Sequence, residues 1–172
     1  PTTDLEIRWR SLSLIPCYNI MVRSDLIREH NIKYPENMPY AEDYAFLIDV
    51  LKYTKASSIP LPLLGYRLHG SNETINRNEY EKIELHSLVI KNAINNELKK
   101  EIDPNQILFS FSSLMLKGIR YFKESSTEKK ILSDFYLDLW EDFRNKHQNN
   151  KLLKNIQRKV LSRATVWNIY PL

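Results

Sequence analysis

Hydrophobic residues recur with a helical period through most of the chain after residue 78. This pattern predicts helices over 79–99, 107–122, 131–143 and 150–163. The second of them follows Asp103-Pro104, in which a capping side chain precedes a proline at the first helical position. The C-terminal part of the chain is therefore predicted to be a helical bundle.

The first 78 residues show a different pattern, because prolines divide them into short pieces. A short helix capped by Ser24 and reaching Glu29 is expected, followed by a longer helix over 42–53. The wide apolar surface of the longer helix indicates that it is buried. Residues 58–67 are expected to form one or two extended segments, which their prolines confine to the edge of a sheet.

The change of pattern near 76–79 predicts two parts, 1–78 and 79–172, in a fold that is α+β and predominantly helical. The composition suits one folded domain with a helical extension, since 42% of the 172 residues are hydrophobic and 27% are charged. That is enough apolar material for a core. No uncharged run is long enough to cross a bilayer.

Glycine and cysteine usage excludes several kinds of site. Three isolated glycines cannot form the glycine-rich phosphate loop of Rossmann or P-loop proteins, so any phosphate-binding half would lie elsewhere. The single cysteine, Cys17, cannot form an internal disulfide and is typical of a reducing compartment. It has no base beside it in the sequence, which favours an inert buried thiol over a nucleophile.

The charge is distributed unevenly. Residues 144–172 carry seven basic side chains and no acid, and because the whole chain carries +4, residues 1–143 carry −3. Within the basic tail, Lys151, Lys154, Arg158 and Lys159 lie opposite an apolar stripe. This pattern suits a helix on an anionic membrane surface or a last bundle helix with a solvated face. Nucleic-acid binding is less favoured, because no recognised motif accompanies the charge.

Two groups of residues are candidates for chemistry. Glu42-Asp43 begins a helix and offers a general base, or else the two carboxylates only complement the positive helix N-terminus. In an extended segment Arg67 and His69 share one face, and with the following Gly70-Ser71 they suit a diphosphate or a metal–diphosphate complex. The alternative is a solvated strand end, and His30, His86 and His147 receive no role.

Several short segments occur in a fixed order between residues 17 and 74. They are Cys17-Tyr18-Asn19, Arg23-Ser24-Asp25-Leu26-Ile27, Asn31-Ile32-Lys33-Tyr34-Pro35-Glu36, Tyr40-Ala41-Glu42-Asp43-Tyr44 and Tyr66-Arg67-Leu68-His69-Gly70-Ser71-Asn72-Glu73-Thr74. This order resembles the second half of bacterial family 2 glycosyltransferases with the GT-A fold. The resemblance covers about a third of the chain, and it implies the acceptor-side part of a GT-A domain followed by a helical bundle.

The resemblance implies roles for the candidate residues. Asp43 matches the general base that deprotonates the acceptor hydroxyl in an inverting transfer, with Glu42 as its supporting neighbour. His69 matches a histidine near the metal and the diphosphate, Arg67 would steady the leaving nucleoside diphosphate, and Ser71 would add a hydroxyl. The implied ligands are a nucleotide-sugar donor, a glycan or lipid-linked acceptor, and Mg²⁺ or Mn²⁺ in the complete enzyme.

The chain also departs from the family pattern. Ile20 stands where the family usually has lysine, and Asn31 stands where the family often has glycine. Ser71 falls one position before the serine of the family pattern. The sequence contains no Asp-x-Asp, the metal-binding motif of the nucleotide-binding half, which would precede Pro1. We therefore expect a fragment of a bacterial enzyme of cell-surface polysaccharide synthesis, inactive alone and cytoplasmic or peripheral on the inner membrane face. The alternative is a non-catalytic helical interaction module whose basic tail binds a partner, a membrane surface or nucleic acid.

Overall fold

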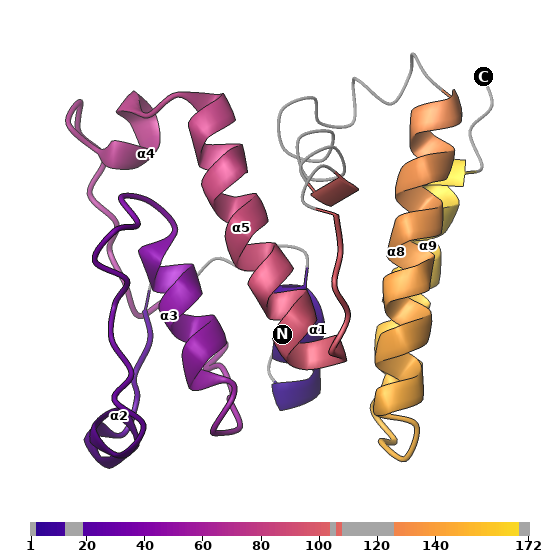
Figure 1. Ribbon diagram of the computed structural model, residues 1–172, viewed down its shortest axis with the longest axis horizontal. Coiled ribbons are helices and arrows are strands. Elements are labelled where there is room, and N and C mark those ends of the chain that lie inside the picture. Colours follow the sequence, from indigo (N-terminus) through magenta and orange to yellow (C-terminus); the bar gives the residue numbers. More distant parts are fainter. Residues whose placement is uncertain (1–2, 13–18, 104–105, 108–125, 169–172) are drawn as a thin grey trace. The chain divides into compact units, whose positions relative to one another are not determined.

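The computed structural model describes residues 3–12, 19–103, 106–107 and 126–168 of the chain, which divides into two compact units at Pro104 and Asn105. The first unit contains α1 (Asp4–Ser11), α2 (Ser24–Glu29), α3 (Glu42–Val50), α4 (Glu73–Asn76) and α5 (Glu79–Leu98) (Figure 1). The second contains α8 (Ser126–Lys146) and α9 (Leu153–Asn168). The described residues form helices and connecting segments without a strand, so the predicted helical character is confirmed.

The core of the first unit lies where α5 packs on α1 and α3. Large apolar side chains from all three helices are buried there, among them Leu5, Ile7 and Trp9 of α1, Tyr44, Leu47 and Ile48 of α3, and Ile83, Val89, Ile90 and Ile94 of α5. Because α5 belongs to this core, the compact unit continues past the change of sequence pattern near residue 78 and ends at Pro104.

Helix α1 is an element that the hydrophobic pattern did not predict. Thr3 caps its start: the Thr3 hydroxyl accepts a hydrogen bond from the Glu6 backbone N–H at 3.3 Å and donates one to the Glu6 carboxylate. The Thr-x-x-Glu spacing at residues 3–6 is the sequence signal for this helix.

The ends of α2 correct one expectation and explain another. Ser24 is the first helical residue, and Arg23 occupies the N-cap position without a side-chain hydrogen bond, so Ser24 does not cap the helix. At the other end Asn31 has a φ of 48°, and the Ile32 N–H reaches the Ile27 carbonyl at 3.1 Å, as in a Schellman motif. This left-handed position favours glycine and next asparagine, which accounts physically for Asn31 at a place where glycine is frequent.

Residues 58–67, expected at a sheet edge, form no strand. Their side chains are exposed, including Leu61 and Leu63. A strand needs a neighbouring strand to receive its backbone hydrogen bonds, and the described part of the chain offers none. The predicted α+β class requires β-strands, and the described residues contain none.

The second unit is a helical hairpin in which α8 and α9 run in opposite directions (Figure 1). Tyr136, Leu139, Trp140 and Phe143 of α8 and Leu153, Ile156 and Val160 of α9 are buried. These helices confirm the predicted periodicity, while most of the helix expected over 107–122 lies outside the described residues, as does Cys17. Among the described helices, none combines the length and apolar character that a bilayer-spanning segment needs.

Arg8 on α1 connects three elements of the first unit. Its guanidinium pairs with Asp4 and with Glu97 of α5, each at 3.0 Å, and donates to the Leu51 and Thr54 carbonyls, each at 2.9 Å. The Arg8 side chain is 18% exposed and that of Glu97 only 9%. Loss of the guanidinium would leave a mostly buried carboxylate and two carbonyls without these partners.

We expect Arg8→Ala to lower the free energy of unfolding of the first unit by about 2–4 kcal/mol, because charged hydrogen bonds in a half-buried network are lost together. Arg8→Lys should fall in between, since lysine keeps the charge without the planar fork. The matched control is Lys52→Ala, which removes an exposed ion pair with Asp49 and should cost less than about 1 kcal/mol. Chemical denaturation measures all three, and equal losses for Arg8→Ala and Lys52→Ala would contradict the role of Arg8.

Candidate functional site

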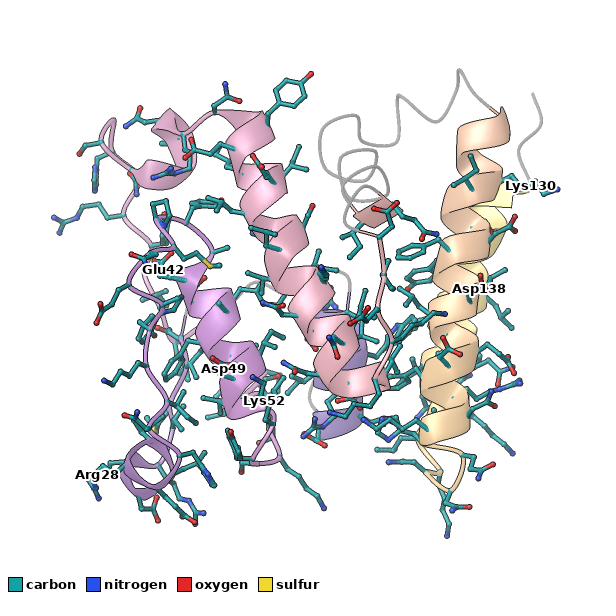
Figure 2. All side chains as sticks on the ribbon, in the orientation of Figure 1. Arg28, Glu42, Asp49, Lys52, Lys130 and Asp138 are labelled. Carbon is teal, nitrogen blue, oxygen red and sulfur yellow. The ribbon has the colours of Figure 1, made fainter. Side chains whose placement is uncertain are left out.

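Glu42 and Asp43 begin α3, as the sequence predicted for a helix start (Figure 2). Glu42 is exposed and Asp43 is half-buried, and a carboxylate oxygen of Asp43 accepts the Tyr44 N–H at 2.7 Å. The residue before them, Ala41, is buried and has a φ of 64°. A residue with a Cβ in this left-handed region costs about 1–2 kcal/mol, and such strain is often found at functional sites.

The first turn of α3 is held from two sides. The Tyr44 side chain is 2% exposed, and its hydroxyl donates to the Ser11 carbonyl at the end of α1. On the other side Arg77, just before α5, donates to the Pro39 carbonyl at 3.3 Å, and its guanidinium lies 5.9 Å from the centre of the Tyr40 ring. These contacts fix the backbone on both sides of the Glu42-Asp43 pair.

His86 of α5 packs against the residues on either side of Glu42-Asp43 and is close enough to influence the pKa of Asp43, although the sequence pattern assigned it no role. Its ring makes an edge contact with Tyr40 at 5.1 Å between centroids and a tilted contact with Tyr44 at 6.3 Å. Its Nδ1 donates to the Lys82 carbonyl at 2.8 Å, because a carbonyl can only accept, so the neutral ring carries its proton there. No local pattern identifies His86, since it lies 43 positions after Asp43 and only the packing of α5 on α3 brings the two near each other.

The two titratable groups have shifted pKa values. Burial raises the pKa of the Asp43 carboxyl and the nearby Glu42 adds to the rise, while the Tyr44 N–H and the His86 ring act against it. Burial lowers the pKa of His86, against the influence of the Lys82 carbonyl and of Asp43. A carboxylate with a raised pKa is a stronger proton acceptor near neutral pH than an exposed one.

Arg67, His69 and Ser71 lie in the exposed segment that leads into α4. The Ser71 hydroxyl is 2.8 Å from Nδ1 of His69. The backbone is held by Asn72, whose side chain accepts the His69 N–H at 2.5 Å and donates to the Arg67 carbonyl at 3.3 Å. His69 and Ser71 are thus brought together, and the hydrogen bonds and ion pairs found among the described residues do not join this group to Glu42 or Asp43.

The loop nevertheless reaches the same end of the unit as the start of α3. It continues through α4 to Arg77, which contacts Pro39 and Tyr40, and Figure 1 shows α4 and the first turns of α5 beyond the N-terminal end of α3. Both groups of candidate residues therefore lie toward one end of the first unit.

The described residues contain no cluster of three or more histidine, cysteine or acidic side chains suited to a metal ion. His69 alone supplies one imidazole, whereas Mg²⁺ and Mn²⁺ prefer oxygen ligands. These residues do not by themselves fit a divalent cation, so a bound metal remains a prediction for the complete protein.

Comparison with known proteins finds a similarity to a protein of Haemophilus influenzae named "Uncharacterized glycosyltransferase". The two are 28% identical over 163 residues, an alignment that covers 84% of this chain and 49% of the relative. The chain therefore spans about half the length of that protein. No family model matches the chain, and the search of solved structures found no significant match.

The shifted pKa values predict a pH dependence of stability. Because the pKa of His86 is lowered from 6.5 in the folded protein, the unfolded chain binds more protons below pH 6.5, and the stability contributed by this group is lost as pH falls through that region. The raised pKa of Asp43 has the opposite sign, so its contribution falls as pH rises from 3.8 through the raised value.

We expect His86→Phe, which keeps a ring between Tyr40 and Tyr44, to reduce the loss of unfolding free energy on acidification just below pH 6.5. Asp43→Asn should enlarge that loss, because the negative charge that supports protonation of His86 is removed. Chemical denaturation on both sides of pH 6.5 distinguishes the variants. The same slope in His86→Phe as in the parent chain would contradict the assignment.

Proposed function

We propose that this chain is the acceptor-side part of a longer, inverting glycosyltransferase of the family 2, GT-A type, followed by a helical C-terminal region. The similarity to the Haemophilus influenzae glycosyltransferase supports sugar transfer in general. The observation that carries the proposal is the position of Asp43. Its carboxyl is half-buried with a raised pKa, at a helix start that contacts with α1 and with Arg77 hold in place.

In the proposed reaction Asp43 accepts the proton of an acceptor hydroxyl. The hydroxyl oxygen then attacks the anomeric carbon of a nucleotide-sugar, and the bond to the nucleoside diphosphate breaks as the new glycosidic bond forms. Glu42 is the supporting neighbour, because its charge adds to the rise in the pKa of Asp43. The acceptor would be a glycan or a lipid-linked sugar of a bacterial surface polysaccharide.

The donor diphosphate would be bound by the loop before α4. Arg67 would supply the positive charge that stabilises a leaving diphosphate. The Ser71 hydroxyl and Nδ1 of His69, 2.8 Å from each other, would supply polar atoms beside the diphosphate. His69 is also the proposed contact of this chain with Mg²⁺ or Mn²⁺, whose oxygen ligands would come from the nucleotide-binding part. When bound, the cation would neutralise charge on the diphosphate.

We expect Asp43→Asn in the complete protein to lower the rate of sugar transfer at least about a hundredfold, because an amide cannot accept the acceptor proton. Binding of the donor nucleotide should stay within about twofold, since the proposed donor contacts lie in the loop before α4 and not at the start of α3. Transfer from a radiolabelled nucleotide-sugar and calorimetric binding of the nucleoside diphosphate measure the two effects.

The matched control is Asp49→Asn on the same helix, where the carboxylate is exposed and pairs with Lys52 toward the other end of α3 (Figure 2). It should leave transfer unchanged. Full activity in Asp43→Asn would remove Asp43 as the base. Absence of transfer by the unaltered complete protein would favour the alternative, a non-catalytic interaction module.

The basic tail would attach the protein to the inner face of a membrane. In α9 the apolar stripe of Leu153, Ile156 and Val160 is buried. Lys154, Arg158 and Lys159 are exposed on α9, and Lys151 is exposed in the turn that precedes it. This favours electrostatic attraction to anionic headgroups over insertion of the helix.

Replacement of these four basic residues by glutamine should weaken partitioning onto phosphatidylserine vesicles at least about tenfold, since each basic residue near such a surface contributes about 1 kcal/mol. The buried stripe is untouched, so helicity should persist. Sedimentation with neutral vesicles is the control, and unchanged partitioning of the variant would overturn this attachment.

A further inference from the structure

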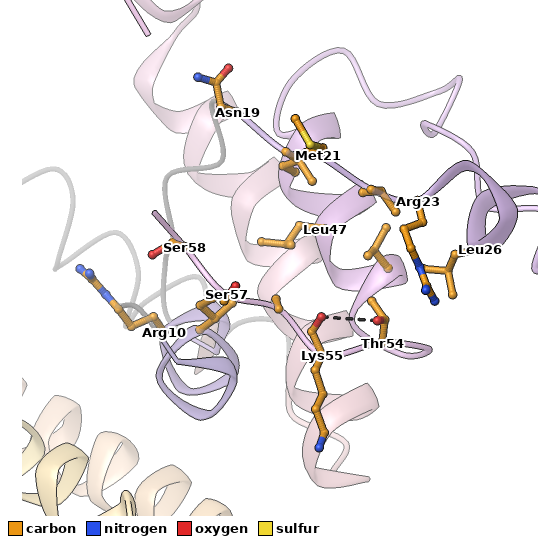
Figure 3. A pocket seen from close by; sticks show the side chains of 15 residues that line it. Arg10, Asn19, Met21, Arg23, Leu26, Leu47, Thr54, Lys55, Ser57 and Ser58 are labelled. Atoms are coloured by element: carbon orange, nitrogen blue, oxygen red, sulfur yellow. Dashed lines mark hydrogen bonds between the residues drawn. The ribbon is translucent and has the colours of Figure 1, made fainter. Parts of the chain in front are cut away.

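The first unit has a groove with a volume of about 630 Å³ beside α3 (Figure 3). Its apolar lining includes Ile7 of α1, Leu26 of α2, and Leu47 and Val50 of α3. Two segments without helix or strand, 19–23 and 54–58, form its sides, and Figure 3 shows Leu47 between them. A polypeptide lying between these segments would have an apolar surface beneath it and non-helical backbone on each side.

The second of these segments continues into a stretch with many exposed apolar side chains. Six large hydrophobic residues are at least half exposed within ten positions: Ile59 66%, Leu61 64%, Leu63 68%, Leu64 50%, Tyr66 52% and Leu68 74%. In an extended chain Ile59, Leu61 and Leu63 would lie on one face. Leu64, Tyr66 and Leu68 would lie on the opposite face. Apolar exposure of this size in a short segment is typical of an interaction surface.

The prolines determine how this segment can pair. In an extended chain the N–H groups of alternate residues point to the same edge, so Pro60 and Pro62 remove two donors from one edge. The other edge keeps the N–H groups of Ile59, Leu61 and Leu63. Residues 59–63 are therefore suited to pair through a single edge, with their apolar side chains on one face.

We infer that the groove and residues 59–68 together are the docking surface for a β-strand from the part of the complete protein that this chain does not span. The similarity to a relative about twice as long indicates polypeptide outside this chain that can supply the strand. This inference rests on the proposed function, because it takes the nucleotide-binding part as the source of the strand. Docking there would join that part to the segment that carries Arg67 and His69.

Amide hydrogen exchange tests the docking without any mutation. The amides of Ile59, Leu61 and Leu63 should exchange at least about a hundredfold more slowly in the complete protein than in this 172-residue chain. Equal exchange in both proteins would overturn the proposal. Protection in the isolated chain that rises with its concentration would also overturn it, because a second copy would then be the occupant.

A variant pair gives a second readout. Leu61→Lys with Leu63→Lys should lower the melting temperature of the complete protein by about 5 °C or more and leave that of the 172-residue chain unchanged, where both side chains are exposed. Leu88→Lys, at an exposed apolar position of α5, is the matched control and should have little effect in either protein. An equal effect of the pair in both proteins would contradict docking.

The two proposals fail separately. Slow exchange at 59–63 together with full transfer by Asp43→Asn would keep the docking surface and remove the catalytic role. Loss of transfer in Asp43→Asn with fast exchange at 59–63 would keep the catalytic role and remove the docking surface.

Discussion

The arrangement of the first unit depends on the guanidinium of Arg8. It is held by Asp4 and Glu97 and donates to two carbonyls just after α3, so one side chain joins α1, the end of α3 and the end of α5. Asp4 adds a further connection by accepting the Ala56 N–H at 2.9 Å. Apolar burial alone permits helices to slide along one another, whereas these directed bonds fix where α3 ends and where the segment from residue 56 begins.

The opposite end of α3 is fixed by different contacts with the same two neighbours. The Tyr44 hydroxyl donates a hydrogen bond to the end of α1, and Arg77, just before α5, and His86 of α5 both contact the Tyr40 ring. With both ends fixed, the left-handed Ala41 is held in a conformation that it would not adopt alone. Asp43 therefore begins a helix whose position and direction are both determined, which is what a proton acceptor in a transfer reaction needs.

The sequence predicted the helices better than it predicted the site. Periodicity identified α5, α8 and α9 because each buries one face along its length, which leaves a repeating signal. Helix α3 was predicted from its wide apolar surface, and most of its apolar residues are buried. Helix α1 depends on the Thr3 cap and on the bonds of Arg8, and neither of these features leaves a hydrophobic period in the sequence. Asp43 and His69 carried local signals, but His86 reaches Asp43 through tertiary packing alone. The expected strand failed for a related reason, since a strand is defined by its partner as well as by its own residues.

The segment from residue 56 to residue 72 shows how one stretch can serve two purposes. Its last residues are held by local hydrogen bonds from Asn72 and Asn76, so the loop with His69 and Ser71 is ordered by its own side chains. Its middle has apolar side chains that face solvent and prolines that leave one edge suited to pairing. The helices form their backbone hydrogen bonds internally, whereas an extended apolar segment needs another chain segment to receive its backbone hydrogen bonds. The part of the unit that needs a partner is thus continuous with the loop proposed to hold the diphosphate, and assembly of the complete protein and formation of its donor site would be one event.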